Sequence, residues 1–282
     1  MTEKIKTQRY LDPLTDFSFK HLFGGEPNKE ILIAFLNAIF EGEKIIADLE
    51  YGNTEREGDI LEEKKVFFDL YCTGRNGEKF VIEMQRSKQK YFKDRSVFYM
   101  SRLVSSLLPK GNFDWDKPIP EVYFIAIMEF PFDDNYKDYV QDVKLMNTMS
   151  KQVFFKGMGF KFLILPNFDK QEEKELVSEF DKWFYLLKNL SRLDKIPHFL
   201  DKRIFRTFFD IAEMSKLTPE QKELYDSDMK AKSDYHGSIA YAAEEAKAQE
   251  KLVIAKELKA DGVALDKIVK YTRLSIEEVE KL

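Results

Sequence analysis

The chain has a single cysteine, Cys72, and three histidines among its 282 residues. One cysteine excludes an internal disulfide framework and indicates a reducing compartment, so we expect a cytoplasmic protein. So few thiol and imidazole groups argue against a structural zinc site. Any bound metal ion is therefore expected to be a hard cation that oxygen atoms hold.

Long apolar runs are also missing. Residues 1–17 contain no apolar core of the kind that a signal peptide needs, and the apolar stretch at residues 122–128 is far too short to cross a bilayer. We therefore expect no membrane partner. The formal net charge of −5 gives no overall attraction to nucleic acid, so any contact with DNA must rest on a local basic patch.

The residues that are present favour a large core, because 44% of them are hydrophobic and 25 are phenylalanine. The pattern predicts an α/β fold over about 190 residues, followed by a helical tail. Predicted strands are residues 44–51, 65–73, 79–85, 121–128, 152–155 and 161–165. Predicted helices are residues 17–23, with Asp16 as N-cap, then 27–40, 88–108, 172–190, 196–214, one from 219, 234–260, 264–271 and 275–282. We expect a main domain at 1–190, a helical connector at 191–233 and a C-terminal module at 234–282.

Two acidic residues stand inside the second and third predicted strands. Asp69 follows Phe67 and Phe68, and Glu83 lies between Ile82 and Met84. A charge inside an apolar strand is costly unless it is paired, hydrogen-bonded or bound to a metal ion. Carboxylates that a lysine or arginine of a neighbouring strand neutralises are the structural alternative to a functional pair.

The turn between these strands decides whether the two carboxylates meet. A two-residue Asn76-Gly77 turn would place Glu83 opposite Leu70 and send Asp69 to the other face. A three-residue turn, with Gly77 left-handed after Arg75 and Asn76, places Asp69 directly opposite Glu83. We predict the three-residue turn, which brings the Cβ atoms of the two acids to about 4.5–5.5 Å.

Two facing carboxylates repel each other, and a divalent cation between them relieves the repulsion. Mg²⁺ suits a site with few carboxylates and retained water, and Mn²⁺ is expected to substitute for it. Gln85 lies two residues beyond Glu83 and so on the same face of the strand. Its amide can orient a water molecule or contact a phosphate, but it cannot serve as a charged acid.

The arrangement of Asp69, thirteen intervening residues and then Glu83-Met84-Gln85 resembles the D…(D/E)-x-K signature of restriction-endonuclease-like nucleases. Glutamine at the lysine position resembles one branch, the PD-(D/E)XK nuclease-family transposases or recombination-promoting nucleases. Three further stretches are similar to that branch: TDFSFKHLFG at 15–24, FKDRSVFYMSRL at 92–103 and FKFLILPNF at 160–168. The resemblance implies a restriction-endonuclease-like core, a mixed sheet flanked by helices, with Asp69, Glu83 and Gln85 as the catalytic centre of a metal-dependent DNA endonuclease.

Basic residues follow the third predicted strand closely, which favours contact with a DNA backbone over a merely solvated helix face. The candidates for DNA contact are Arg86, Lys88, Lys90, Arg95 and Arg102. The resemblance also places the segment with Asp16 and Lys20 near the active site, where both are candidates for a supporting role. Asp16 as a simple N-cap is the alternative.

The tail at residues 251–282 has helix-turn-helix spacing, but its last helix is acidic, which favours an interaction module over a DNA-reading one. The resemblance allows this tail to restrain the nuclease or to mediate self-association. The sequence thus predicts an endonuclease of low sequence specificity, in a recombination, mobile-element or phage-defence setting. The alternative is a catalytically weak nuclease-fold module that binds DNA or protein.

Overall fold

The computed structural model describes residues 8–56, 66–108, 118–131 and 136–282. The chain forms two compact units, Met1–Tyr225 and Asp226–Leu282. The predicted domain boundaries at 190 and 233 stay a prediction. Among the helices of the described residues, none is both long enough and apolar enough to span a bilayer.

The first unit is built on a mixed sheet, which has six strands within the described residues, in the order β1-β4-β5-β6-β8-β7. β6 is parallel to both β5 and β8, and the other neighbouring strands are antiparallel. The strands are β1 (Leu49–Tyr51), β4 (Leu70–Gly74), β5 (Lys79–Gln85), β6 (Val122–Met128), β7 (Val140–Met146) and β8 (Val153–Ile164). The short strands β2 (Glu55–Arg56) and β3 (Val66–Phe67) pair with each other outside this sheet.

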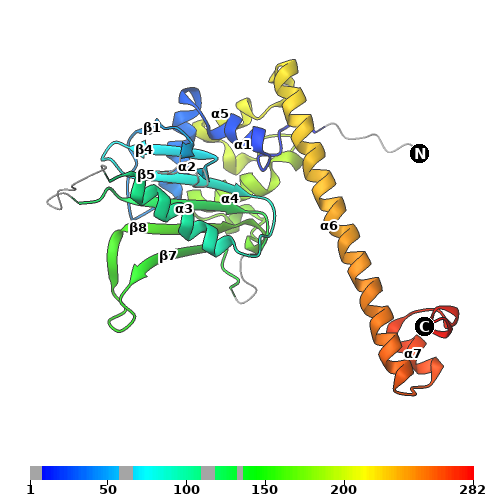
Figure 1. Ribbon diagram of the computed structural model, residues 1–282. Coiled ribbons are helices and arrows are strands. Elements are labelled where there is room, and N and C mark those ends of the chain that lie inside the picture. The colour runs from blue at the N-terminus through cyan, green and yellow to red at the C-terminus, as the bar shows by residue number, and fades with distance from the viewer. Residues whose placement is uncertain (1–7, 57–65, 109–117, 132–135) are drawn as a thin grey trace. The chain divides into compact units, whose positions relative to one another are not determined.

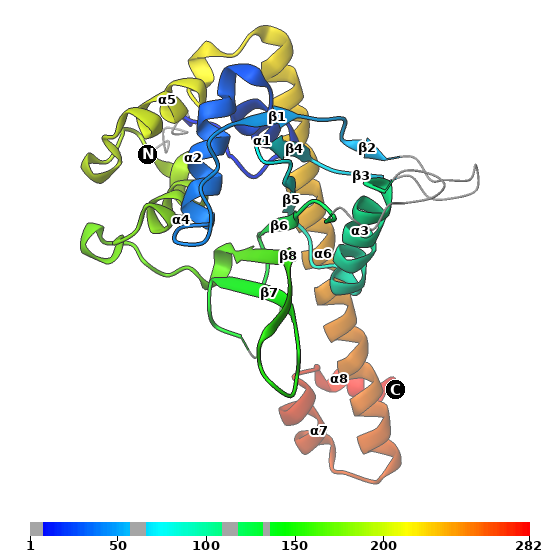
Figure 2. The same cartoon turned by 90° about the vertical axis from the view of Figure 1, so that its left-hand side faces the viewer.

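Helices cover both faces of the sheet (Figures 1 and 2). One face packs against four helices: α1 (Asp16–Phe23), α2 (Lys29–Ile39), α4 (Glu179–Asn189) and α5 (Arg203–Ile211). The other face packs against α3 (Phe92–Ser106), through Phe92, Met100 and Leu103. Because β6 is buried along its whole length, it is the central strand covered on both faces that its apolar run predicts.

The four-helix face holds the larger core. Its centre is aromatic, since Phe23, Phe35 and Phe208 all contact the ring of Trp183 at centroid distances of 5.5–6.2 Å. Cys72 of β4 belongs to this core and is fully buried. Cys72 therefore lies on the face of the sheet opposite Glu83.

Two predicted strand boundaries are wrong. The strand predicted at 44–51 is ordered as β only over Leu49–Tyr51, because Asn37 takes the backbone groups of Ile46: its side-chain amide bonds the Ile46 N–H at 2.8 Å and the Ile46 C=O at 2.9 Å. The strands predicted at 152–155 and 161–165 are one strand, β8. β8 continues through Gly157 and Gly159 because it pairs with β7 on one side and β6 on the other. The register of the β7–β8 pairing shifts on both sides of Leu145.

Three predicted helices begin later or are shorter than expected. The helix predicted from residue 88 begins at Phe92, since residues 86–91 connect the end of β5 to the face of the sheet. The helix predicted at 172–190 is α4, which begins after Ser178, because Ser178 and Asp181 form a capping box. The helix predicted at 196–214 is α5, Arg203–Ile211, preceded by a 3₁₀ turn at His198–Leu200.

Helix α6 (Pro219–Ala260) merges the two predicted helices that begin at 219 and 234. Its predicted start is confirmed, because Pro219 is the first helical residue and Thr218 Oγ1 accepts the Gln221 N–H at 3.2 Å. The second unit contains the rest of α6, then α7 (Leu265–Thr272) and α8 (Ile276–Glu280). Ala255, Ile268 and Val279 form its small core, and a Ser275–Glu278 capping box begins α8.

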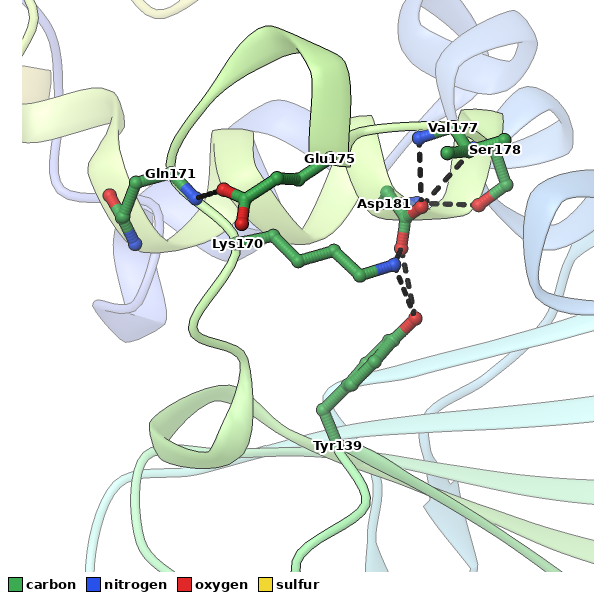
Figure 3. A network of polar contacts seen from close by, with 7 residues as sticks. All are labelled: Tyr139, Lys170, Gln171, Glu175, Val177, Ser178 and Asp181. Atoms are coloured by element: carbon green, nitrogen blue, oxygen red, sulfur yellow. Dashed lines mark hydrogen bonds and ion pairs between the residues drawn. The ribbon is translucent and has the colours of Figure 1, made fainter.

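A buried carboxylate ties α4 to the strand end at Tyr139 (Figure 3). Asp181 is 2% exposed, and its Oδ1 accepts the Lys170 ammonium at 2.7 Å and the Tyr139 hydroxyl at 2.9 Å. Its Oδ2 accepts the backbone N–H groups of Val177 and Ser178. Burial by itself raises the pKa of Asp181, but these hydrogen bonds outweigh burial and hold the pKa below its ordinary value.

Asp181→Asn should therefore destabilise the protein by about 2–4 kcal/mol at pH 7, because it leaves the Lys170 ammonium without its counter-charge. A carboxylate with a lowered pKa stabilises the fold at neutral pH, and this contribution disappears as the pH falls through the lowered value. Urea unfolding at pH 7 and pH 3 should show a large difference from wild type at pH 7 and a smaller one at pH 3. Asp169→Asn, an exposed neighbour with the same change of charge, should stay within about 0.5 kcal/mol; equal losses in both variants would contradict this account.

Candidate active site

The β4–β5 hairpin has the predicted three-residue turn. Gly77 has φ +87°, its N–H donates to the Gly74 C=O at 2.9 Å, and the Gly74 N–H donates to Glu78 C=O at 2.8 Å. Leu70 is consequently paired with Ile82. Continued by one residue, this register puts Asp69 opposite Glu83, which confirms the predicted turn and its register.

Asp69 lies at the entrance of β4 rather than in the middle of a strand. The strand predicted at 65–73 is divided into β3 and β4 by Phe68 and Asp69, and residue 65 lies outside the described residues. The division arises because β3 leaves the large sheet to pair with β2, whereas β4 pairs with β1 and β5. Asp69 thus occupies a bend, where its side chain can reach the end of β5.

Each acid accepts a backbone hydrogen bond from the segment that carries the other acid. The Asp69 N–H donates to Glu83 Oε1 at 3.3 Å, and the Met84 N–H donates to Asp69 Oδ2 at 2.7 Å. The Gln85 amide donates to Glu83 Oε2 at 3.3 Å. Glu83 is 4% exposed and Gln85 7% exposed. The structure therefore brings Asp69, Glu83 and Gln85 together at one point.

Burial and mutual repulsion dominate the electrostatics of this pair. Burial raises the pKa of Glu83 to about 8, and the negative charge of Asp69 adds to this effect. Burial likewise raises the pKa of Asp69, against the lowering effect of the Met84 hydrogen bond. Among the residues that the structure describes, no lysine or arginine forms an ion pair with either carboxylate.

The residues present fit a divalent cation. Two acids contribute four carboxylate oxygens, and Asp69 Oδ1 makes no hydrogen bond to any described residue. Mg²⁺ typically takes one or two carboxylates and completes its shell with water and phosphate oxygens. Within the described part of the chain, no cluster of three acidic, histidine or cysteine side chains offers an alternative metal site.

Helix α1 carries two charged residues, Asp16 and Lys20, that affect Asp69. Asp16 raises the pKa of Asp69 and Lys20 lowers it, after the larger effects of burial and the Met84 hydrogen bond. Asp16 and Lys20 form an exposed ion pair at 2.9 Å. The prediction that Asp16 is the N-cap is wrong, because Thr15 accepts the Ser18 N–H and so leaves Asp16 in the first turn. The charges of Asp16 and Lys20 thus shift the pKa of Asp69 in opposite directions, and their supporting role stays a prediction.

Helix α3 also carries two residues near the carboxylate pair, Arg95 and Tyr99, which lie one helical turn apart. The charge of Arg95 lowers the pKa of both Asp69 and Glu83. Tyr99 lies near the pair as well. Burial raises its pKa most, Arg95 lowers it, and the charges of Glu83 and Asp69 raise it further. Sequence reasoning missed Tyr99, although its i+4 spacing from Arg95 was the available signal.

The other predicted DNA contacts lie in two places. Lys88 and Lys90 are exposed in the β5–α3 connection, whereas Arg86 and Arg102 are half-buried. Arg86 Nη1 and Arg95 Nε are buried without a hydrogen-bond acceptor among the described residues. Buried N–H groups normally have an acceptor, and a phosphate would supply one for each guanidinium.

A mixed sheet flanked by helices, with a D…E-x-Q constellation on adjacent strands, is consistent with the PD-(D/E)XK nuclease class. Residues 13–242 match the family described as PD-(D/E)XK nuclease family transposase, and the chain belongs to this family. The family indicates a nuclease-like function, and PD-(D/E)XK nucleases generally use divalent metal ions. Comparison with curated proteins gave no match, and neither did comparison with solved structures.

Glu83→Gln should change the pH dependence of stability in EDTA. An acid with a raised pKa stabilises the fold below its unfolded pKa, and this contribution is lost as the pH rises through the folded value of about 8. Wild type should therefore lose stability between pH 5 and pH 8, at up to about 1.4 kcal/mol per pH unit, and Glu83→Gln should lose much less. Thermal or urea unfolding across this range measures the difference.

Glu78→Gln is the matched control on the same hairpin. Glu78 is equally buried at 4% exposed, but it is paired with Lys44 at 3.3 Å and its pKa is lowered. This variant should lose about 1–3 kcal/mol at every pH between 5 and 8. If instead Glu83→Gln lost several kcal/mol at pH 8, Glu83 would be a structural ion-pair partner and not a metal ligand.

Proposed function

We propose that the chain is a DNA endonuclease of low sequence specificity that depends on a divalent metal ion, with Mg²⁺ as the expected ion and Mn²⁺ as a substitute. The observation that carries the proposal is the facing pair of half-buried Asp69 and buried Glu83, which has no cationic side chain as an ion-pair partner among the described residues. The membership of the chain in the PD-(D/E)XK nuclease family transposases supports it.

Asp69 and Glu83 would hold the ion with their carboxylate oxygens. When bound, such an ion supplies a nucleophile from water at neutral pH and stabilises negative charge on a phosphate. Binding also favours the ionised form of both acids, against the burial that raises their pKa values.

Gln85 orients rather than ionises. Its amide already donates to Glu83 Oε2, which fixes the rotamer of the metal-binding acid, and its carbonyl oxygen can accept a hydrogen from the attacking water. Lysine would bring a positive charge to this position, and glutamine does not. We therefore expect slower turnover than a lysine-containing site would give.

The cations around the pair would hold the DNA backbone. Arg95 faces the two acids from α3, and Lys88 and Lys90 stand exposed in the connection from the catalytic strand. Arg86 and Arg102 extend this set. Phosphate contacts of this kind give affinity without sequence readout, which agrees with an enzyme of low specificity.

The second unit is proposed as an interaction module that mediates self-association or restrains the nuclease. Its last helix carries Glu277, Glu278 and Glu280, a composition that does not suit a helix in the major groove. The setting we propose is cytoplasmic, in recombination, mobile-element activity or phage defence.

Plasmid nicking tests the catalytic assignment. With Mg²⁺ or Mn²⁺, the wild-type protein should relax supercoiled DNA, and EDTA should abolish the activity. Asp69→Ala and Glu83→Ala should each lower the rate by roughly a hundredfold or more, because each removes charge that the transition state requires. Asp169→Ala, an exposed acid outside the site, should cut as wild type does. Binding without cleavage under either metal would favour the second candidate, a catalytically weak DNA- or protein-binding module.

The salt dependence of binding tests the proposed DNA contacts. Each phosphate contact contributes roughly 0.9 to the slope of log affinity against log salt, so Lys88→Ala/Lys90→Ala should reduce that slope by up to about 2. Duplex binding in EDTA, followed by fluorescence anisotropy across a salt series, measures the slope. Lys174→Ala, whose side chain is 78% exposed next to Glu172, is the control and should leave the slope unchanged. An unchanged slope in the double variant would show that these lysines only solvate the loop.

A further inference from the structure

A row of side chains runs across the sheet from the carboxylate pair. Glu83 of β5 is paired with Ala126 of β6, Ala126 with Phe162 of β8, and Phe162 with Gln141 of β7. All four lie on the α3 face of the sheet. Because neighbouring strands are spaced by about 4.8 Å, Gln141 lies roughly 14 Å from Glu83 along this row.

The far end of this row opens into a cavity of about 310 Å³ between α3 and the β7–β8 edge. Phe160, Phe162 and Tyr136 supply aromatic walls, with Val97 and Val143 beside them. The rings of Phe160 and Phe162 are stacked, with centroids 6.1 Å apart and an interplanar angle of 5°, and both contribute to the aromatic surface of the cavity. Its volume is at the lower end of the range for small-ligand pockets, roughly 300–1,000 Å³, which suits one flat ring system.

One polar group at this cavity points to a ligand, and a charged residue stands beside it. Gln141 Nε2 is buried and has no acceptor among the described residues, although a buried amide normally has one. Lys93 stands exposed at the lining and adds a positive charge. A planar ligand with hydrogen-bond acceptors on its edge would satisfy the Gln141 amide and lie against the aromatic walls, and a phosphate attached to it would be attracted by the charge of Lys93.

The faces of α3 connect this cavity with the carboxylate pair. Arg95 and Tyr99 lie on the side that acts on Asp69 and Glu83, whereas Lys93, Ser96 and Val97 line the cavity. A DNA strand bound near the acids could therefore extend along α3, from Arg95 to Lys93. The roughly 14 Å between Glu83 and Gln141 corresponds to about four nucleotides at most, given a spacing of at least 3.4 Å per nucleotide. A base in the cavity would therefore belong to a nucleotide close to the phosphate that binds at Glu83.

We propose that this cavity binds one unpaired nucleobase of the strand that is cut, stacked on Phe160 and hydrogen-bonded by Gln141. This inference rests on the proposed function and deepens it, because it makes single-stranded or locally opened DNA the preferred substrate. A base inside a duplex cannot enter, since it must leave its stack to reach the aromatic surface.

The test uses the full-length protein in EDTA, so that binding is measured without cleavage. A labelled single-stranded oligodeoxynucleotide is compared with versions that carry one abasic position, moved along the strand. At one position, loss of the base should weaken binding by roughly fivefold or more, the range for removal of one stacked base. Gln141→Ala and the cavity-filling Val143→Trp should weaken binding of the intact strand similarly, and should have little further effect on that abasic strand.

Phe154→Ala is the matched control, because Phe154 is an 81% exposed aromatic residue of β8 outside the cavity. It should leave both affinities unchanged. Equal weakening of the intact and abasic strands by Gln141→Ala and Val143→Trp would overturn the proposal, and so would equal binding of every abasic strand. Displacement of the oligonucleotide by a free deoxynucleoside monophosphate at its own saturating concentration would overturn the assignment to the DNA strand and make the cavity a nucleotide site.

These outcomes are separable from those of the nicking assay. A protein that discriminates the abasic position but cuts no plasmid keeps the base site and loses the endonuclease assignment. A protein that nicks plasmid with no discrimination among the abasic strands keeps the endonuclease assignment and loses the base site.

Discussion

Repulsion between a buried carboxylate, Glu83, and its half-buried neighbour, Asp69, is the constraint on which the first unit's chemistry depends. Asp69 and Glu83 face each other because a three-residue turn with left-handed Gly77 sets the register of β4 and β5. A turn shorter by one residue would put the two acids on opposite faces. Without a cation, burial disfavours the charged form of each acid, and the pKa of each is raised for this reason.

Helix α3 and the connection before it place basic residues beside the Asp69–Glu83 pair, where they could contact the phosphates of a DNA backbone. The parallel arrangement of β5 and β6 requires a crossover connection, and α3 is that connection. It therefore lies over the same face that carries Glu83, and the charge of its Arg95 acts on both acids. Lys88 and Lys90, which precede α3, are exposed because they belong to the connection from the strand end to the helix, not because they begin a solvated helix.

Much of this organisation is readable in the sequence, because local rules decide it. The turn chemistry of Gly77 predicts the hairpin register, and the continuous apolar run at 122–128 predicts the buried central strand. Contacts between residues far apart in the sequence decide the strand boundaries that the sequence did not predict. β3 pairs with β2 outside the large sheet, and the Asn37 side chain takes the backbone hydrogen bonds of Ile46 that a neighbouring strand would otherwise make. The row from Glu83 to Gln141 spans four strands, so periodicity within any one strand cannot reveal it.

The lone thiol offers a practical consequence. Cys72 lies in β4, three residues from Asp69, and burial raises its pKa to about 12. A thiol held protonated and enclosed in this way reacts slowly with alkylating agents and oxidants while the sheet is intact. Its rate of modification therefore reports opening of the strand that carries the acidic pair, and the native protein needs no reductant to protect it.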